Sequence, residues 1–138
     1  MVRAVFDTNI FLRALINPQS HCGRLLSSLT PYYVLVLSPA IIREDLEVLH
    51  RPTLRDKFPM IKEIGVSEII SILEKAEVVE PQDQVEASRD PKDNMFLACA
   101  KEGRAAYLVS QDKDLLSLRQ FQGAEIVDVE TFMAVLEP

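Results

Sequence analysis

The sequence predicts an α/β domain in which a parallel sheet is covered by helices on both faces. Short apolar runs rich in β-branched residues alternate with stretches of helical periodicity along the whole chain. Such alternation is typical of parallel sheets, whose crossover helices cover both faces. The 138 residues are enough for one hydrophobic core, and no repeat or linker-like stretch divides them. We therefore expect a single domain over residues 1–138.

The N-terminal part of the chain predicts two strands and two helices. The apolar runs VRAVF and YVLVL place strands at Val2–Phe6 and Tyr33–Leu37. A helix over Thr8–Ile16 follows the first strand, because the Asp-Thr-Asn sequence at its start is suited to capping. A second helix, over residues 20–29, is expected to end before Thr30-Pro31.

The middle of the chain predicts three helices and a short strand. Ser38 is a good N-cap and Pro39 fits the first helical position, so a helix is expected to run to about Leu49. Arg51-Pro52 ends this helix. The elements that follow are a short helix near residues 54–58, a helix over 66–76 and a strand over 77–79.

The C-terminal part of the chain continues the alternation. Asp90-Pro91 is expected to begin a helix that runs to about Glu102, with Gly103 as its stop. The remaining predicted elements are a strand over 106–110, a short helix over 112–118, a strand over 125–127 and a helix over Val129–Leu136.

Composition excludes several classes of protein. No apolar run approaches the roughly 18 to 20 residues of a membrane span, and the N-terminus lacks the layout of a signal peptide. Cys22 and Cys99 form no CxxC pair, so we expect free thiols in a reducing cytoplasm and no zinc site. The net charge of −6 argues against binding of nucleic acid by the whole surface. It leaves open a site where clustered carboxylates hold metal ions that meet phosphates.

Acidic residues recur where the predicted strands end or helices begin. In doubly wound sheets, ligands bind beyond the carboxyl ends of the strands, which points to Asp7 and Asp112. Each acid also has a structural interpretation: Asp90 as an N-cap, Asp93 as an acid that suits the helix dipole. Asp7, Asp112 and Asp114 can likewise cap the helices that they precede or begin. The full set of candidates is Asp7, Glu44, Asp45, Asp90, Asp93, Asp112 and Asp114.

Glu44 and Asp45 lie about two turns into their predicted helix, beyond the reach of capping. On a helical wheel Glu44 falls at the edge of the apolar arc, and Asp45 falls within it. An unpaired buried carboxylate is costly, so at least one of the two should meet a cation or a hydrogen-bond donor. The residue at the boundary is better placed to face a cleft, which favours Glu44. A surface salt bridge with Arg43 or Arg51 remains open for the other acid.

The chemistry that suits clustered carboxylates is metal-assisted hydrolysis of a phosphodiester. Several carboxylates at one end of a sheet cannot all stay ionised without a cation to neutralise them. Their oxygens select Mg²⁺ or Mn²⁺, which pair with substrate phosphates and lower the pKa of bound water. The sequence has no GxSxG motif, no Ser-His-Asp arrangement and no glycine-rich phosphate loop that would favour another reaction.

Four stretches of the sequence resemble the PIN-domain ribonucleases, in particular the bacterial and archaeal branch regarded as toxins of toxin–antitoxin systems. These stretches are VFDTNIFLRAL at 5–15, SPAIIREDLEVLHRP at 38–52, RDPKDNMFLACA at 89–100 and LVSQDKDLL at 108–116. Each motif is weak alone, but their order and spacing are specific, and together with the predicted elements they cover nearly the whole chain. The resemblance implies an α/β/α sandwich with a five-stranded parallel sheet in the order 3-2-1-4-5, which puts the first and fourth strands side by side.

The resemblance also implies the site residues. The family's acids fall on Asp7, Glu44, Asp93 and Asp112, with Asp114 as a supplement, and in the family they hold Mg²⁺ or Mn²⁺ for cleavage of single-stranded RNA. Thr8, Asn9, Asn94 and Ser110 fall on supporting polar positions, which orient carboxylates or bind water on the metal. Asp45 departs from the pattern, since an aromatic or aliphatic residue is expected there, and it leaves open which acid of the pair faces the metal.

The resemblance extends to partners. It implies an antitoxin protein that silences the enzyme, and a homodimer. A set of basic residues lies on or near the motifs, where it either meets RNA phosphates or is solvated surface: Arg13, Arg43, Arg51, Lys92 and Lys113.

Three alternatives to a nuclease are tested by single positions. A phosphatase of the haloacid dehalogenase type needs a second Asp two residues after the first, where this chain has Asn9. A receiver domain of a response regulator needs an Asp at the end of the third strand, where Glu80-Pro81 fits poorly. A PIN fold that only binds RNA or protein is expected to lack one or more of the acids, and none is missing here. These positions favour a metal-dependent endoribonuclease.

Overall fold

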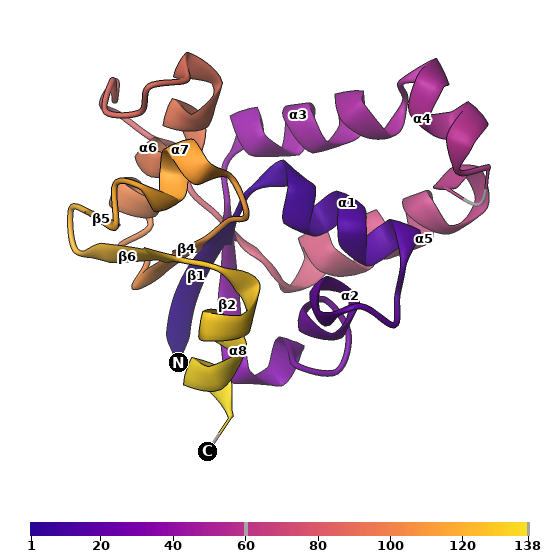
Figure 1. Cartoon of the computed structure of the whole chain (residues 1–138), viewed down its shortest axis with the longest axis horizontal. Helices are drawn as coiled ribbons and strands as arrows, with labels where there is room; N and C mark the ends of the chain where they lie inside the picture. The colour runs from indigo at the N-terminus through magenta and orange to yellow at the C-terminus, as the bar shows by residue number, and fades with distance from the viewer. Residues whose placement is uncertain (60, 138) are drawn as a thin grey trace.

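The central sheet of the protein has six strands in the order β3-β2-β1-β4-β6-β5, and Figure 1 shows β1 and β2 side by side within it. The computed structural model describes residues 1–59 and 61–137. Every neighbouring pair of strands is parallel except β5 and β6, which are antiparallel. The parallel strands are β1 (Val2–Phe6), β2 (Tyr33–Leu37), β3 (Glu77–Val78), β4 (Tyr107–Val109) and β6 (Ala124–Val127). These five confirm the predicted α/β class and the predicted strand order, since β6 is the fifth strand of the prediction.

The predicted count of five strands is wrong by one short edge strand. β5 (Gln120–Phe121) pairs with β6 through a hairpin whose two loop residues, Gln122 and Gly123, have φ values of 51° and 90°. Positive φ at both positions matches the type I′ turn that favours tight hairpins. Two residues are too few to show an alternating pattern, and Gln-Gly is not among the residue pairs that signal such a turn.

Three helices begin and end as predicted, since α3 runs from Pro39 to Leu49 as the Ser38-Pro39 start indicated, and the others differ at their ends. α1 (Thr8–Ile16) and α8 (Val129–Leu136) match the prediction. α2 (His21–Leu25) stops before residue 29; residues 26–29 form a turn, and a short 3₁₀ turn, η1 (Thr30–Tyr32), then leads into β2. The helices after β2 are α3 (Pro39–Leu49), α4 (Pro52–Lys57) and α5 (Ile61–Lys75), and α5 begins earlier than the predicted residue 66.

The helix predicted from Asp90-Pro91 to Glu102 has two parts. A 3₁₀ turn, η2 (Pro91–Asp93), comes first, and α6 (Asn94–Glu102) follows it. Asp90 caps the 3₁₀ turn, since its side chain accepts a hydrogen bond from the backbone N–H of Lys92 at 3.0 Å. The last short helix is α7 (Lys113–Leu116), shorter than the predicted 112–118.

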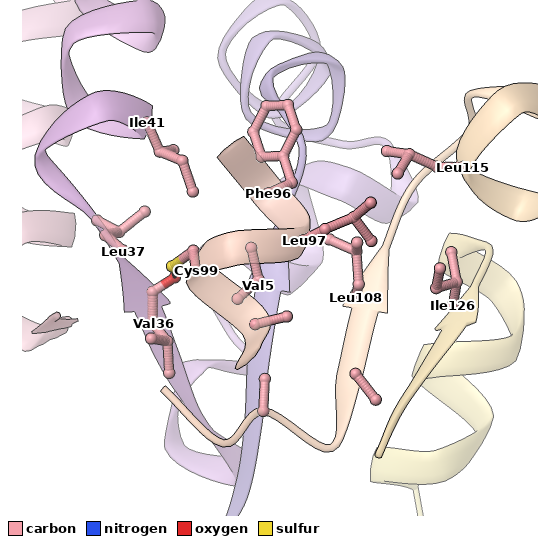
Figure 2. Close-up of a cluster of buried hydrophobic side chains, with 13 residues drawn as sticks. Val5, Val36, Leu37, Ile41, Phe96, Leu97, Cys99, Leu108, Leu115 and Ile126 are labelled. Atoms are coloured by element: carbon pink, nitrogen blue, oxygen red, sulfur yellow. Dashed lines mark hydrogen bonds between the residues drawn. The ribbon is translucent and has the colours of Figure 1, made fainter. Parts of the chain in front are cut away.

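Helices cover both faces of the sheet because the buried strands alternate their side chains between two apolar cores. Val5 of β1 packs under α6 and α7 with Leu97 and Leu108 (Figure 2). Its neighbours Ala4 and Phe6 face the opposite core, which α1, α2 and α8 complete. The thiols of Cys22 and Cys99 are buried and free.

The outer side of α1 forms a third apolar cluster with the α3–α4–α5 segment. Phe11 and Leu15 of α1 pack there with Leu49 at the end of α3 and Ile61 at the start of α5. α3, α4 and α5 therefore run around the outer side of α1 (Figure 1). Within the described ranges 1–59 and 61–137, no helix has both the length and the apolar character to cross a membrane.

Candidate active site

A cleft of about 210 Å³ lies at the carboxyl ends of β1 and β4. Four segments that are distant in sequence contribute to it: the start of α1, the middle of α3, the η2 turn with the start of α6, and the residue that precedes α7. Its polar lining residues are Asp7, Thr8, Asn9, Glu44, Arg51, Asp90, Lys92, Asp93 and Asp112. Parallel strands bring these segments together, because their carboxyl ends meet at one edge of the sheet.

Asp7 lies between β1 and α1 and is only 4% exposed. One carboxylate oxygen accepts a hydrogen bond from the backbone N–H of Ile10 at 3.1 Å, which caps α1. The other accepts a short hydrogen bond from the hydroxyl of Ser110, the residue after β4. Burial raises the pKa of Asp7, and the nearby charge of Asp112 adds to this effect. Capping is therefore one of two interactions that this carboxylate makes.

Ser110 connects Asp7 to the second acidic segment. Its hydroxyl oxygen also accepts a hydrogen bond from the backbone N–H of Asp112 at 2.9 Å. Asp112 in turn caps α7, since its carboxylate accepts a hydrogen bond from the backbone N–H of Asp114 at 2.8 Å. Ser110 is completely buried, so one hydroxyl fixes the positions of two acids relative to each other.

Asp93, Asp112 and Asp114 form the tightest acidic cluster in the described part of the chain. Each offers one carboxylate oxygen, and these three oxygens lie within 4.8 Å of one another. Burial, and then the charge of Asp112, raises the pKa of Asp93 to about 7. One oxygen of Asp93 (Oδ2) is buried and has no hydrogen-bond partner among the described residues.

The acidic cluster fits a divalent cation. A buried carboxylate oxygen without a donor costs free energy, and neighbouring carboxylates increase that cost unless a proton or a cation neutralises them. Hard oxygen donors at this spacing are the ligand set that Mg²⁺ and Mn²⁺ prefer. Asp93, Asp112 and Asp114 have the geometry to hold one such ion, and Asp7 and Glu44 line the same cleft.

α3 directs Glu44 and Asp45 to different places. Glu44 lines the acidic cleft, as the helical wheel indicates. Asp45 lines an apolar cavity of about 30 Å³ together with leucine, isoleucine and phenylalanine side chains. Burial raises the pKa of Asp45 to about 7. Asp45 Oδ1 and Thr8 Oγ1 are both buried, and neither has a hydrogen-bond partner among the described residues. The nearby Thr8 hydroxyl offsets part of the rise in the pKa of Asp45.

The structure separates the other predicted residues into two groups. Thr8, Asn9, Arg51 and Lys92 line the cleft. Arg51 also pairs with Glu47 at 3.2 Å. Asn94 faces away and accepts a hydrogen bond from the backbone N–H of Ser88 at 2.9 Å. The other basic residues of the prediction are exposed and do not line the cleft: Arg13, Arg43 and Lys113.

Asp90 is a cleft residue that the sequence assigned only a structural role. It does cap η2, but it also lines the cleft, and its charge contributes to the raised pKa of Asp93. The apolar wall of the cleft, formed by Leu12, Val48, Met95 and Phe96, was not predicted either. The signal for Asp90 was its position three residues before Asp93, which places both acids on the same short turn.

The fold is similar to that of three solved structures. VapBC2 from Rickettsia felis, bound to a DNA fragment from its promoter, matches over 92% of this chain and 98% of that chain, with a TM-score of 0.60 and 12% identity. DNA-bound VapBC from Salmonella typhimurium matches over 94% and 99%, with a TM-score of 0.57 and 17% identity. PAE2754 from Pyrobaculum aerophilum matches over 98% and 89%, with a TM-score of 0.57 and 19% identity. At these identities the likeness shows the fold.

Sequence comparison adds the family. The uncharacterized protein MJ1680 of Methanocaldococcus jannaschii is 32% identical over 120 residues, which are 86% of this chain and 76% of the relative. Residues 3–114 match the profile of the PIN domain, a range that contains Asp7, Glu44, Asp93 and Asp112. The chain therefore belongs to the PIN domain family.

Proposed function

We propose that this PIN-domain protein is a metal-dependent endoribonuclease that hydrolyses phosphodiester bonds of single-stranded RNA. The observation that carries the proposal is the convergence of acids from four separate segments on one cleft, with a buried carboxylate oxygen of Asp93 left without a donor. A structural role explains each acid singly, but it gives no reason for their convergence. Shared coordination of a cation gives one.

The roles of the acids follow from their contacts. Asp93, Asp112 and Asp114 would hold Mg²⁺ or Mn²⁺, and Asp7 and Glu44 would complete the negative lining of the cleft. When bound, such an ion lowers the pKa of water and stabilises negative charge on phosphate oxygens. Ser110 keeps Asp7 and Asp112 in fixed positions, and Thr8 and Asn9 add polar groups at the start of α1. Asn94 supports the site indirectly, because it holds the chain at Ser88.

Substrate phosphates would meet the two cations that line the cleft. Lys92 lies on η2, beside Asp93, and Arg51 lies after the end of α3, so the two cations come from different segments of the chain. Both can pair with the phosphate groups on either side of the scissile bond. Arg13, Arg43 and Lys113 are exposed and would reach only more distant phosphates. This arrangement lets a protein of net charge −6 bind RNA through a local site.

We further propose that the enzyme is the toxin of a toxin–antitoxin pair, acts in the cytoplasm, forms a homodimer and is silenced by an antitoxin protein. Two of the similar structures are VapBC assemblies bound to DNA, which supports a protein partner for this chain. The alternative, a PIN fold that only binds RNA or protein, is less well supported, because every acid expected of the enzyme lines the cleft or adjoins it.

A cleavage assay with metal control tests the proposal. Purified protein is incubated with single-stranded RNA in Mg²⁺ or Mn²⁺, with and without EDTA, beside Asp93→Asn. Cleavage that needs the metal and disappears in the variant is expected. Cleavage that is unaffected by EDTA, or equal in Asp93→Asn of intact fold, would contradict it.

A further inference from the structure

A second hollow, of about 530 Å³, lies beside the acidic cleft and is separated from it by η2. Residues 90–94, in and beside this turn, divide between the two spaces. Asp90, Lys92 and Asp93 line the cleft, whereas Pro91 and Asn94 line the hollow. Met95 lines both, so the two spaces meet at its side chain. A linear polymer bound in the cleft can therefore extend into the hollow by crossing a single short turn.

The lining of the hollow differs from that of the cleft. Val85 and Met95 supply apolar surface, and both also pack against the core beneath α6. Asp83, Gln84 and Glu86 supply polar groups at the rim. No lysine or arginine occurs among the described residues that line it. A lining that contains the carboxylate of Glu86 and, among the described residues, no lysine or arginine disfavours a phosphate. Apolar surface with hydrogen-bond acceptors instead suits a flat neutral group that carries N–H donors.

The loop that forms the rim is held in place before any ligand binds. The backbone N–H of Gln82 donates to the carboxylate of Glu102 at 3.0 Å, and Asp83 pairs with Lys101 at 2.9 Å. At the other end, the backbone N–H of Ser88 donates to Asn94. Between these anchors Glu86 is exposed and makes no hydrogen bond within the described part of the chain, so its carboxylate is free to accept one. Such preorganisation lowers the entropic cost of binding.

We propose that this hollow binds the base of a nucleotide next to the scissile phosphate. The inference rests on the proposed ribonuclease function. The phosphate lies by Lys92 on one side of η2, and the base reaches the other side, where it packs on Met95 and donates from its exocyclic amino group to Glu86. Adenine, cytosine and guanine carry such an amino group, whereas uracil offers only its ring N3–H, so the proposed contact favours a base with an exocyclic amino group at one position.

Abasic substrates combined with a charge-matched control test this assignment. A set of single-stranded RNAs shares one cleavage site, and each member carries an abasic ribose at one position near it. kcat/KM is measured for the wild type, Glu86→Gln and Glu130→Gln. Glu130 is an exposed acid on α8, which packs on the opposite face of the sheet, so its replacement changes the net charge equally without touching the hollow.

We expect one abasic position, adjacent to the cleavage site, to lower kcat/KM of the wild type by roughly tenfold. Glu86→Gln should cleave the intact RNA about 3- to 10-fold more slowly than the wild type. Glu86→Gln and the wild type should cleave that abasic RNA at the same rate, because the interaction with the base is absent from both. Glu130→Gln should match the wild type on the intact RNA and on the abasic RNA.

Three results would overturn the assignment. An equal loss on intact and abasic RNA would place the effect of Glu86 outside base binding. Wild-type rates for Glu86→Gln on every RNA would show that the hollow serves another partner, such as a protein. Absence of any cleavage by the wild type would overturn the proposed ribonuclease function together with this assignment. The first two results would overturn the assignment alone.

Discussion

Asp45 places a carboxylate where α3 faces the apolar interior. Its pKa is raised to about 7 from the ordinary 3.8, chiefly by burial. The folded protein therefore binds a proton more tightly than the unfolded chain does. Linkage then requires that the free energy of unfolding falls as pH rises from about 4 to about 7, by an upper bound of about 4 kcal/mol from this group.

Asp45→Asn should remove that pH-dependent penalty. In EDTA, which keeps metals from the cleft, the variant is expected to exceed the wild type in stability by about 1–3 kcal/mol at pH 8, with the difference shrinking towards pH 5. Urea unfolding at a series of pH values measures it. Asp56→Asn, at an exposed position on α4, is the control. A stability difference that is constant with pH would show that Asp45 is not buried as described.

Ser110 is the residue on which the relative positions of two acids depend. Ser110→Ala leaves an oxygen of Asp7 and the backbone N–H of Asp112 without their partner. A loss of about 1–3 kcal/mol in stability is expected, together with a fall of at least about tenfold in kcat. Ser27→Ala, at an exposed position, removes a hydroxyl bonded to the carbonyl of Gly23 on α2 and is the control for loss of a serine hydroxyl away from the cleft. Undiminished kcat in Ser110→Ala would contradict the positioning role.

Individual positions show what the sequence reveals of the site. The helical wheel places Glu44 at the boundary of the apolar arc, and Glu44 does line the cleft. The contact between Asp7 and Ser110 joins residues 103 positions apart and follows only from the pairing of β1 with β4. Asn94 shares a motif with Asp93 but faces the other side of η2, because a 3₁₀ turn replaces the predicted first turn of helix.

Among the elements, α2 depends on a close approach between backbones. A Cβ added at Gly23 would lie 2.2 Å from the carbonyl oxygen of Pro18, with two further Pro18 backbone atoms within 2.7 Å. Backbone atoms cannot move aside as a flexible side chain can. The position therefore tolerates only glycine while α2 keeps its place.

Gly23→Ala should lower the free energy of unfolding by about 2 kcal/mol or more, which lowers the Tm by several degrees. RNA cleavage per folded molecule should change little, since α2 packs with α8 and does not line the cleft. Thermal unfolding compared with Ser28→Ala, at a neighbouring exposed position, measures the effect. An unchanged Tm would show that α2 and Pro18 are not in this close contact.

Elements with a strong local signal were predictable. Buried strands appear as apolar runs, and the Ser38-Pro39 start of α3 is fixed by a side-chain cap and a proline. Prediction failed where tertiary contacts set the ends. The hairpin of β5 is too short to show a period, and α5 is extended towards its N-terminus where Ile61 packs against α1.

For the molecule as a whole, the acidic cleft should couple stability to metal binding. A cation that binds only the folded state adds about 2.7 kcal/mol at a concentration 100 times its Kd. Mn²⁺ should therefore raise the Tm by several degrees, and Asp93→Asn should weaken this rise. Sodium chloride at equal ionic strength separates site binding from screening of the net charge of −6. An equal rise in both salts would argue against a site.

In the proposed mechanism Asp7 performs chemistry as well as capping α1, and a pair of N-cap variants tests this dual role most directly. Asp7 caps α1, and Asp128 caps α8 in the same way, through a hydrogen bond from Thr131 at 2.8 Å. Asparagine caps as well as aspartate, so Asp7→Asn and Asp128→Asn should both fold. We expect cleavage of single-stranded RNA in Mn²⁺ to fall by at least about 100-fold in Asp7→Asn and to stay at the wild-type level in Asp128→Asn. Equal cleavage by the two variants would contradict the account.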